Sequence, residues 1–489
     1  MRPAVLLSLA LGLTRSTTLA LPSPAQHVLS LSAPPSEHSL DFDYAVDPPD
    51  EDGGEAEVHG TDSTGTGHYS QWSRANKEEF LSALRDNNAR DWIIVMGNEA
   101  GDLDSMVSAM ALSFMYNHLD PPQKAVSILQ TEQDALDLRP ENALSLHYAK
   151  MSSGHRDLLT IDELPIKPDE IGHRIKGIAL VDHNVPRSVW EKAKIVAIID
   201  HHEDRGVANG TANPRIIETS GSCSSLVTRY ILDTLPQETG SDSLARKGDL
   251  EALSKSPLPE ELVELLLRTI AIDSDGLSKT SRQKVDKESA ERLFVHSSWK
   301  HRKLKEVMKT LDKDLSASRK ALDGLDLRNL LRRDWKGDSI PTKSNKYPTI
   351  ALGFASAPVS LEGQIERTPE KTVPEWFAIE RAWTSEIQAD VTVALTNFRH
   401  PKTGKKTRQL ALIVAHGLGK RLHAGSADRL FKQLKHAVEN AGVDGLKPWK
   451  RPDDKPLLPR RAVYEYQSDI ASRKLWRPVL EDAVRAWRG

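Results

Sequence analysis

Four short apolar runs, each followed by acidic or histidine residues, constrain this chain more than any other feature. They occupy residues 92–97, 178–181, 195–199 and 269–272. Each is a continuous stretch of mainly Ile, Val, Leu and Ala, without the apolar–polar alternation of a strand that is buried on one face only. Such runs are typical of strands buried on both faces of a parallel sheet. We therefore predict an α/β fold whose N-terminal sheet is mostly parallel and is flanked by helices.

The polar residues behind these runs form one candidate site. They are Asn98, Asp102, Asp104, Asp182, Asp200, His201, His202 and Asp273. Ligand-binding residues of open α/β sheets collect beyond the carboxyl ends of the strands, so we expect these side chains to meet at one edge of the sheet. Acids delivered there from four segments repel one another, and divalent cations are the simplest way of neutralising them.

The donor atoms indicate the kind of metal. Aspartate oxygen and histidine nitrogen suit Mn²⁺, Mg²⁺, Co²⁺ or Zn²⁺, whereas structural zinc sites mostly use thiolates, and Cys223 is the only cysteine. Two ions held close together lower the pKa of a shared water and stabilise the attacking and leaving oxygens of a phosphoryl group. Asp182 is the natural bridging carboxylate. The neighbours His201 and His202 point to opposite sides of an extended backbone, so we predict that one binds metal and the other faces the substrate.

The same residues fall in motifs that resemble those of the DHH phosphoesterases, and most of all those of the fungal exopolyphosphatases. The motifs occupy residues 97–105, 181–184, 200–202 and 221–225. The C-terminal third resembles the second-type DHH-associated domain, at residues 395–396, 412–414 and 472–474. The resemblance implies two catalytic divalent ions, Mn²⁺ or Mg²⁺ before Co²⁺ or Zn²⁺. It also implies release of terminal orthophosphate from linear inorganic polyphosphate, in a cleft between two domains.

Two positions separate the related subfamilies. Family II inorganic pyrophosphatases have a metal-binding His where this chain has Asn98, and an amide carbonyl is a poorer ligand. Animal prune proteins carry Arg at the position of His202, so this histidine favours an exopolyphosphatase. A pyrophosphatase and a prune-like interaction protein with weak phosphodiesterase activity stay open as alternatives. The related nucleases end in a glycine-rich domain that has no match here, so no nucleic-acid partner is expected.

The resemblance gives each candidate residue an expected role. As catalytic residues we predict Asn98, Asp200 and His202. As metal ligands we predict Asp102, Asp104, Asp182, His201 and Asp273. As substrate-binding residues we predict His202, Arg408, Arg473 and Lys474. Arg408 ends a basic turn at residues 399–408, and residues 342–489 hold 26 basic and 16 acidic residues. A basic domain facing an acidic metal site suits a polyanionic substrate, although charge alone would fit nucleic acid equally well.

Composition divides the chain into four parts. Residues 1–20 combine Arg2, an apolar stretch and small residues, which is typical of a signal peptide. Residues 21–73 hold ten acidic residues and no Lys or Arg, and are predicted to be disordered. Residues 74–322 are the expected catalytic domain, and residues 323–489 the smaller substrate-binding α/β domain with a mixed sheet.

No segment is long and apolar enough to span a membrane. The N-terminus predicts the secretory pathway, vacuolar or extracellular, whereas related enzymes are cytoplasmic. No feature of the sequence indicates an oligomeric state.

Periodicity and breaker residues give further elements. We predict helices at residues 77–87, 105–119 and 224–235, a polar insertion loop at residues 237–257, and helices within residues 284–333. In the C-terminal domain we predict strands at residues 349–356, 391–397 and 410–415. The serines of residues 221–225 are read as helix caps in preference to phosphate contacts, because Ser is a common N-cap.

Overall fold

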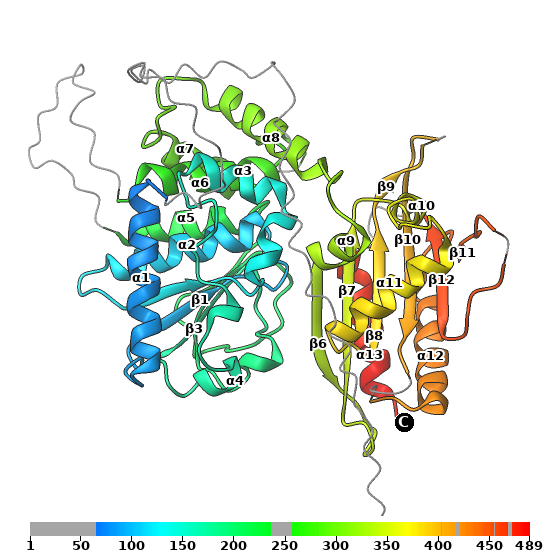
Figure 1. The fold of residues 1–489 in the computed structure, drawn as a ribbon. Helices are drawn as coiled ribbons and strands as arrows, with labels where there is room; N and C mark the ends of the chain where they lie inside the picture. Colours follow the sequence, from blue (N-terminus) through cyan, green and yellow to red (C-terminus); the bar gives the residue numbers. More distant parts are fainter. Residues whose placement is uncertain are drawn as a thin grey trace, which may run out of the picture. The chain divides into compact units, whose positions relative to one another are not determined.

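The computed structural model describes residues 65–235, 257–280, 282–401, 403–416, 421–453, 455–467 and 472–489. The signal-peptide prediction, most of the predicted disordered segment and nearly all of the predicted insertion loop lie outside the described residues. No helix of the described part is long and apolar enough to cross a membrane. Figure 1 shows two groups of elements, each built around its own sheet.

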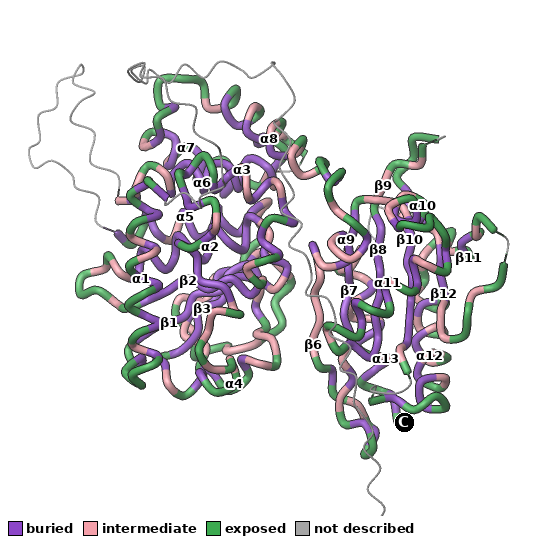
Figure 2. Tube along the Cα trace, viewed as in Figure 1, coloured by how far each residue is buried: buried purple, intermediate pink, exposed green. Residues whose placement is uncertain are grey.

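The first sheet is entirely parallel and follows the order β2-β1-β3-β4-β5. Its strands are β1 Ile93–Met96, β2 Ala125–Ile128, β3 Gly177–Val181, β4 Ile195–Asp200 and β5 Arg215–Ile217. Three of the four apolar runs are β1, β3 and β4, so these predictions are confirmed. The sequence analysis missed β2 and β5, which are short strands at the two edges. Both β1 and β3 are buried throughout (Figure 2).

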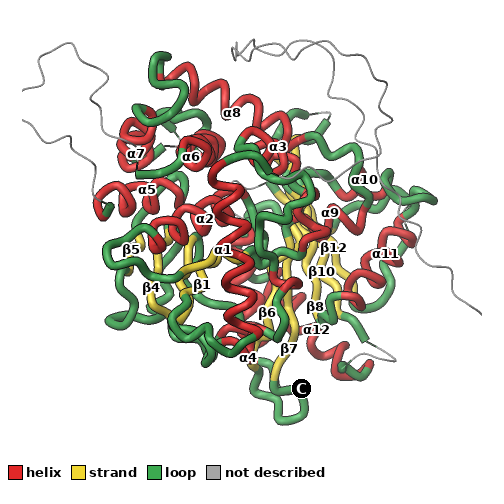
Figure 3. Tube along the Cα trace, turned by 60° about the vertical axis from the view of Figure 1, so that its left-hand side comes forward, coloured by secondary structure: helices red, strands yellow, loops and turns green. Residues whose placement is uncertain are grey.

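Helices cover both faces of this sheet (Figure 3). One face packs Ile94, Met96 and Leu180 against helix α1 (His68–Arg85) and against Ile171 of α4 (Pro168–Ile171). The other face lies against α2 (Leu103–Asn117) and α5 (Cys223–Thr234), with α6 (Glu260–Asp273) and α7 (Lys284–Phe294) packed behind them. The predicted crossover helices at residues 105–119 and 224–235 are confirmed, each with small shifts at its ends. The remaining helices of this half are η1 Gln133–Leu138, α3 Pro140–Tyr148, η2 Ile161–Glu163, η3 Ser188–Trp190 and α8 Leu304–Lys320.

The fourth apolar run is not a strand, and that prediction is wrong. Residues 269–272 form the end of α6, a helix of 14 residues. The preceding Glu-Leu-Val-Glu-Leu-Leu-Leu sequence carries apolar residues at helical spacing, and nearly every apolar side chain of α6 is buried. A helix buried on most of its surface cannot be told from a buried strand by four residues alone. Asp273 therefore reaches the site from the end of a helix.

Helix α1 begins at His68, nine positions before the predicted start and inside the segment predicted to be disordered. Tyr69 explains the earlier start. Its ring is fully buried and lies 5.5 Å from Trp72 and 6.1 Å from Phe114, measured between ring centroids. Aromatic contacts of this kind supply much of the free energy that holds a first helical turn, and the polar composition of residues 65–73 concealed them.

The C-terminal half forms a mixed sheet in the order β11-β12-β10-β8-β7-β6, with β9 paired to β10. Strands β7 and β8 are parallel, and the other pairs are antiparallel. The strands are β6 Trp335–Pro341, β7 Thr349–Ala357, β8 Val391–Thr396, β9 Phe398–Arg399, β10 Lys406–Val414, β11 Lys447–Pro448 and β12 Arg461–Tyr466. The three predicted strands and the mixed sheet are confirmed.

This second sheet is also covered on both faces. Helices α12 (Ala424–Glu439) and α13 (Arg473–Ala486) pack on one face, where Trp476 of α13 is fully buried. The opposite face carries α9 (Leu327–Arg333), α10 (Leu361–Ile365) and α11 (Val373–Glu386). Helix α13 is important for the site, because its N-terminal residue is Arg473.

Glu380 of α11 is a carboxylate buried in the C-terminal domain, where it is 1% exposed. Its Oε1 accepts hydrogen bonds from the hydroxyls of Thr384 and Thr392, whereas Oε2 has no partner among the described residues. Burial raises the pKa of the Glu380 carboxyl above its usual range, and the two hydroxyls only partly offset it. A carboxyl whose folded-state pKa is raised destabilises the fold as the pH climbs from the unfolded-state pKa through the folded one.

We therefore expect Glu380→Gln to raise the Tm at pH 8 and to change it less at pH 5. Glutamine keeps the acceptor oxygen but carries no charge that burial would penalise. Thermal unfolding followed by circular dichroism at the two pH values measures the effect, with Glu366→Gln, an exposed residue of the same domain, as the control. A lower Tm at pH 8 would show that the charged form of Glu380 stabilises the fold.

Candidate active site

The candidate site lies just beyond the carboxyl ends of β1, β3 and β4. Asp182 directly follows β3 and has φ of 58°. This left-handed conformation costs a non-glycine residue free energy and is often found at functional sites. The backbone N–H of Asp182 still donates to the carbonyl of Ile199 on β4, at 3.1 Å. The turn therefore holds the carboxylate in a fixed position beside the end of β4.

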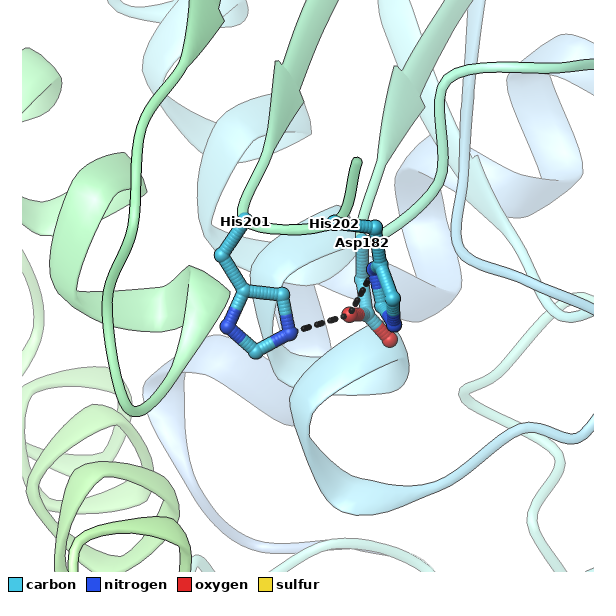
Figure 4. A group of neighbouring side chains, drawn as sticks. All are labelled: Asp182, His201 and His202. Atoms are coloured by element: carbon cyan, nitrogen blue, oxygen red, sulfur yellow. Dashed lines mark ion pairs between the residues drawn. The ribbon is translucent and has the colours of Figure 1, made fainter. Parts of the chain in front are cut away.

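Asp182 is the centre of the cluster, and its side chain is only 4% exposed. Oδ2 accepts hydrogen bonds from Asn98 Nδ2 at 2.7 Å and from Ser105 Oγ at 2.5 Å. Oδ1 lies 3.2 Å from His201 Nε2 and 3.7 Å from His202 Nδ1. Figure 4 shows the two imidazole rings approaching the carboxylate. Ligand atoms of these three residues lie within 4.8 Å of one another, so a single ion could contact all three.

The two histidines are held by different partners, although both rings approach the carboxylate of Asp182, whereas the sequence analysis expected them on opposite sides of the backbone. His201 Nδ1 donates to the carbonyl of Ser220 at 3.0 Å, which leaves Nε2 directed at Asp182. A backbone carbonyl on the second ring nitrogen is the usual arrangement for a metal-binding histidine. Burial alone would lower the pKa of His201, but the hydrogen bond with Asp182 and the charges of Asp104 and Asp182 together outweigh it and raise the pKa to about 10.

Asp200 forms hydrogen bonds with both histidines. Its Oδ1 accepts the backbone N–H of His201 and Nδ1 of His202, each at 2.8 Å, and Oδ2 accepts Asn184 Nδ2 at 2.5 Å. Burial would raise the pKa of Asp200, but the hydrogen bond and charge of His202, together with the hydrogen bond from Asn184, hold it below the usual range. An ionised carboxylate with both oxygens occupied orients His202, whose side chain is 32% exposed.

Asn98 is buried, and both atoms of its side-chain amide are in use. Nδ2 donates to Asp182, and Oδ1 accepts the backbone N–H of Ala100 at 3.0 Å. This second bond closes the loop that carries Asp102 and Asp104. The carbonyl oxygen would have to give up part of that bond in order to bind a metal, which agrees with the weak ligand predicted at this position.

Asp104 is held by the start of α5. Its two oxygens accept Ser222 Oγ at 2.8 Å and the backbone N–H groups of Cys223 at 2.6 Å and Ser224 at 2.8 Å. Ser222 is the N-cap residue of α5 by position, but its hydroxyl makes no capping hydrogen bond and donates to Asp104 instead, so the prediction of a serine cap is wrong in this respect. Burial and the charge of Asp182 raise the pKa of Asp104 to about 6. The positive end of the α5 dipole favours the charged form of Asp104, but it offsets only part of the effect of burial and of the neighbouring acids.

Asp102 and Asp273 lie outside the group of three around Asp182. Asp102 is the N-cap of α2, where its Oδ1 accepts the N–H of Ser105 at 3.0 Å. Asp273 at the end of α6 lies 3.6 Å from Arg319 of α8. Burial raises the pKa of Asp273 well above its usual range, and the charge of Asp104 adds to the shift. Its carboxylate therefore belongs to the same repelling group.

The residues present fit divalent metal ions. Five predicted ligands offer carboxylate oxygens and one imidazole nitrogen, which are donors for Mn²⁺, Mg²⁺, Co²⁺ or Zn²⁺. Burial and the neighbouring acids raise the pKa values of Asp104 and Asp273, and the positive charges of His201 and Arg319 offset the shifts only in part. Among the described residues, Asp273 is the only predicted ligand whose carboxylate forms an ion pair with an arginine. Bound cations would supply the missing charge.

A pocket of about 630 Å³ opens over this cluster, and residues of both halves of the chain line it. The N-terminal half contributes Asn98, Asp182, Asp200, His201 and His202. The C-terminal half contributes one side of α13 and part of β6. The predicted substrate residues Arg473 and Lys474 line the pocket together with the histidines, although hundreds of residues separate them in sequence. The pocket thus lies between the two halves of the chain, where the sequence analysis expected the site.

Several lining residues were missed by the sequence analysis. Lys336 of β6 and Arg477 of α13 add cations to the C-terminal wall, and Arg187 adds one to the N-terminal wall. Arg187 Nε is buried without a hydrogen-bond partner among the described residues, which leaves a donor for an anion. Glu99 lies 3.8 Å from Arg477 across the pocket.

Arg408 does not line this pocket. It lies on β10, in register with Tyr466 of β12. The basic turn at residues 399–408 is the β9–β10 hairpin, and none of its described residues lines the pocket either. A role of Arg408 in substrate binding stays a prediction, whereas Arg473 and Lys474 are in position to meet a ligand.

A cluster of buried carboxylates and imidazoles that opens into a cation-lined pocket is the arrangement of a metal-dependent phosphoesterase. Two family models match the chain. The DHH family, N-terminal domain, matches residues 92–269, and the DHHA2 domain matches residues 313–483. The chain therefore carries a DHH-family N-terminal domain followed by a DHHA2 domain.

Individual proteins show the same similarity. The Schizosaccharomyces pombe protein named "Putative exopolyphosphatase" is 27% identical over 418 residues, which cover 83% of this chain and 94% of that protein. "Exopolyphosphatase PRUNE1" of Mus musculus is 25% identical over 419 residues, 84% of this chain and 79% of that protein. The crystal structure of a "putative family II inorganic pyrophosphatase" of Methanococcus jannaschii is 18% identical, with a TM-score of 0.46, and covers 80% of this chain and 99% of that one.

Proposed function

We propose that this chain, a hydrolase acting on phosphoanhydrides, is an exopolyphosphatase that uses two divalent metal ions to release terminal orthophosphate from linear polyphosphate. The observation that carries the proposal is that one pocket is lined both by candidate metal ligands and by positively charged side chains. The Asp182, His201 and His202 cluster lies at one wall, and Lys336, Arg473 and Lys474 lie at another. Relatives named as exopolyphosphatases from yeast and mouse support the substrate class.

The metal ions would be held by Asp102, Asp104, Asp182, His201 and Asp273, with Asp182 between them. When bound, divalent ions lower the pKa of water and stabilise charge on phosphoryl oxygens. Hydrogen bonds within the protein orient three of these ligands. Asn98 and Ser105 orient Asp182, the N-terminus of α5 orients Asp104, and the carbonyl of Ser220 orients His201.

The remaining polar residues of the pocket act on the substrate. His202 receives its orientation from Asp200, so its exposed ring edge can donate a hydrogen bond to a phosphate oxygen. Arg473 can grip two phosphate oxygens with its planar fork, whereas Lys336 and Lys474 act as point charges. A terminal phosphate placed over the metal ligands would have its neighbouring phosphates next to these cations, which favours a chain of phosphates as the substrate.

Orthophosphate release measures the proposal directly. We expect the full chain, freed of metal with a chelator and then supplied with Mn²⁺ or Mg²⁺, to release orthophosphate from long polyphosphate faster than from pyrophosphate. Faster turnover of pyrophosphate would make the chain a pyrophosphatase. Hydrolysis of neither substrate, with weak cleavage of a phosphodiester, would instead support the prune-like alternative.

Asn98→His tests the residue that distinguishes the subfamilies. An imidazole is a stronger ligand than an amide carbonyl that already accepts the N–H of Ala100. We expect the variant to bind its first metal more tightly and to raise the ratio of pyrophosphate to polyphosphate turnover. Metal titration by calorimetry and the two rates measure these effects. Asn98→Ala is the control, because it removes the same hydrogen bonds without adding a ligand. Equal behaviour of the two variants would show that Asn98 only shapes the loop.

A further inference from the structure

We propose that Asp334 is a positioning residue, which presets the guanidinium of Arg473 for the substrate and links it to the loop that carries the metal ligands. This inference rests on the proposed function, because it assigns Arg473 to a substrate phosphate. Asp334 itself is absent from the residues that line the pocket, so it acts through Arg473 without touching the substrate.

The contact between the two residues is made twice. Arg473 Nη1 donates to Asp334 Oδ1 at 3.0 Å and to the Asp334 carbonyl at 3.2 Å. The two residues are 139 positions apart, and each stands at the end of an element. Asp334 lies between α9 and β6, and Arg473 opens α13. A guanidinium held by one nitrogen keeps its other N–H groups available for a phosphate in the pocket.

The backbone around Asp334 is itself fixed. Its carbonyl also accepts the N–H of Ser356 at 3.1 Å, where β7 pairs with β6. Lys336, two residues further along β6, lines the pocket. This short segment therefore provides one cation of the pocket, Lys336, and holds another, Arg473. A free arginine would lose its rotamer freedom on binding substrate, whereas a tethered one has already lost it.

Arg139 extends the link to the N-terminal half. Its Nη2 lies 3.5 Å from Asp334 Oδ1, and its Nε donates to the carbonyl of Ala100 at 2.9 Å. Ala100 lies between Asn98 and Asp102 in the loop of the predicted metal ligands. Arg139 is 8% exposed, so this contact is shielded from water. One carboxylate thus contacts the arginine that faces the substrate and the arginine that holds the metal loop.

Electrostatics agree with a permanently charged Asp334. Burial would raise the pKa of its carboxyl, but Arg473, Arg139 and Lys336 outweigh burial and hold the pKa below its usual range. A second reading is that Asp334 only stabilises the junction of α9, β6 and α13. If Asp334 had only this structural role, Asp334→Asn would lower kcat/KM by the same factor whether residue 473 is arginine or alanine. A positioning role instead predicts a smaller loss when Arg473 is absent, so a double-mutant cycle separates the two.

The cycle uses Asp334→Asn, Arg473→Ala and the double variant in the full chain. It measures kcat/KM for polyphosphate with Mn²⁺, and also the dissociation constant for polyphosphate in chelator, where turnover stops. We expect Asp334→Asn to lower kcat/KM about tenfold in the wild-type background and by less than about twofold when Arg473 is already alanine. Asp334→Glu keeps the carboxylate, so we expect its kcat/KM to lie between those of the wild type and Asp334→Asn.

Glu386→Gln is the matched control, because Glu386 pairs with Arg328 at the surface of the same domain, and it should leave both constants unchanged. Equal losses from Asp334→Asn in the two backgrounds would overturn the inference and leave Asp334 as a purely structural residue. A wild-type chain that leaves polyphosphate intact would contradict the proposed function instead. In that case the dissociation constants for polyphosphate alone test the inference, and Asp334→Asn should weaken binding more in the wild-type background than in the Arg473→Ala background.

Discussion

Replacement of Asp182 by alanine should abolish metal-dependent hydrolysis and leave the fold largely intact. Asp182 is the one carboxylate that contacts Asn98, Ser105 and His201 together, and it is the predicted bridge between two ions. Its loss should exceed the roughly 100- to 1000-fold effect of deleting a single stabilising donor at an active site. Orthophosphate release under saturating Mn²⁺ measures the loss, and circular dichroism checks the fold.

Asp182→Asn and Asp233→Ala complete this experiment. The asparagine variant keeps the shape of the site and one acceptor oxygen, so its inactivity could not be attributed to a cavity. Asp233 pairs with Arg292 at the surface of the same half of the chain, and its alanine variant should keep wild-type activity. Substantial metal-dependent hydrolysis in Asp182→Ala would contradict the two-metal assignment.

Arg473→Ala should lower kcat/KM for polyphosphate and leave metal affinity unchanged. The variant removes a charge-assisted contact to a phosphate, and contacts of this kind contribute on the order of 1.5–3 kcal/mol. Steady-state kinetics and metal titration by calorimetry measure the two effects. Arg328→Ala is the control, because Arg328 pairs with Glu386 and does not line the pocket. Loss of metal binding in Arg473→Ala would contradict the division of roles between the two halves.

The sequence predicted the strands that carry the site because those strands are buried on both faces. A continuous run such as residues 195–199 has one simple interpretation in an α/β protein, and β4 confirms it. The same rule failed at residues 269–272, where a helix packed on most sides gives the same short apolar run. The difference depends on tertiary packing, which a window of four residues does not contain.

The candidate site shows a similar division. Asp182, His201 and His202 could be predicted because each follows a strand whose end lies at the same edge of the sheet. Asp334 could not, since its role depends on the packing of α13 beside β6 and is invisible to motif spacing. Charge counting recognised a basic C-terminal half. It could not tell that Arg473 lines the pocket while Arg408 lies on β10 outside the lining.

Phosphorus NMR during the hydrolysis of polyphosphate of a single defined length tests the central claim most directly. An enzyme that removes terminal phosphates should produce orthophosphate from the first time point, while the ratio of end-group to internal signals in the remaining chains rises gradually. All turnover should stop in chelator and return with Mn²⁺ or Mg²⁺. Early appearance of chains of intermediate length without orthophosphate would show internal cleavage, and undiminished hydrolysis in chelator would show a reaction that needs no metal. Either result would contradict a metal-dependent exopolyphosphatase.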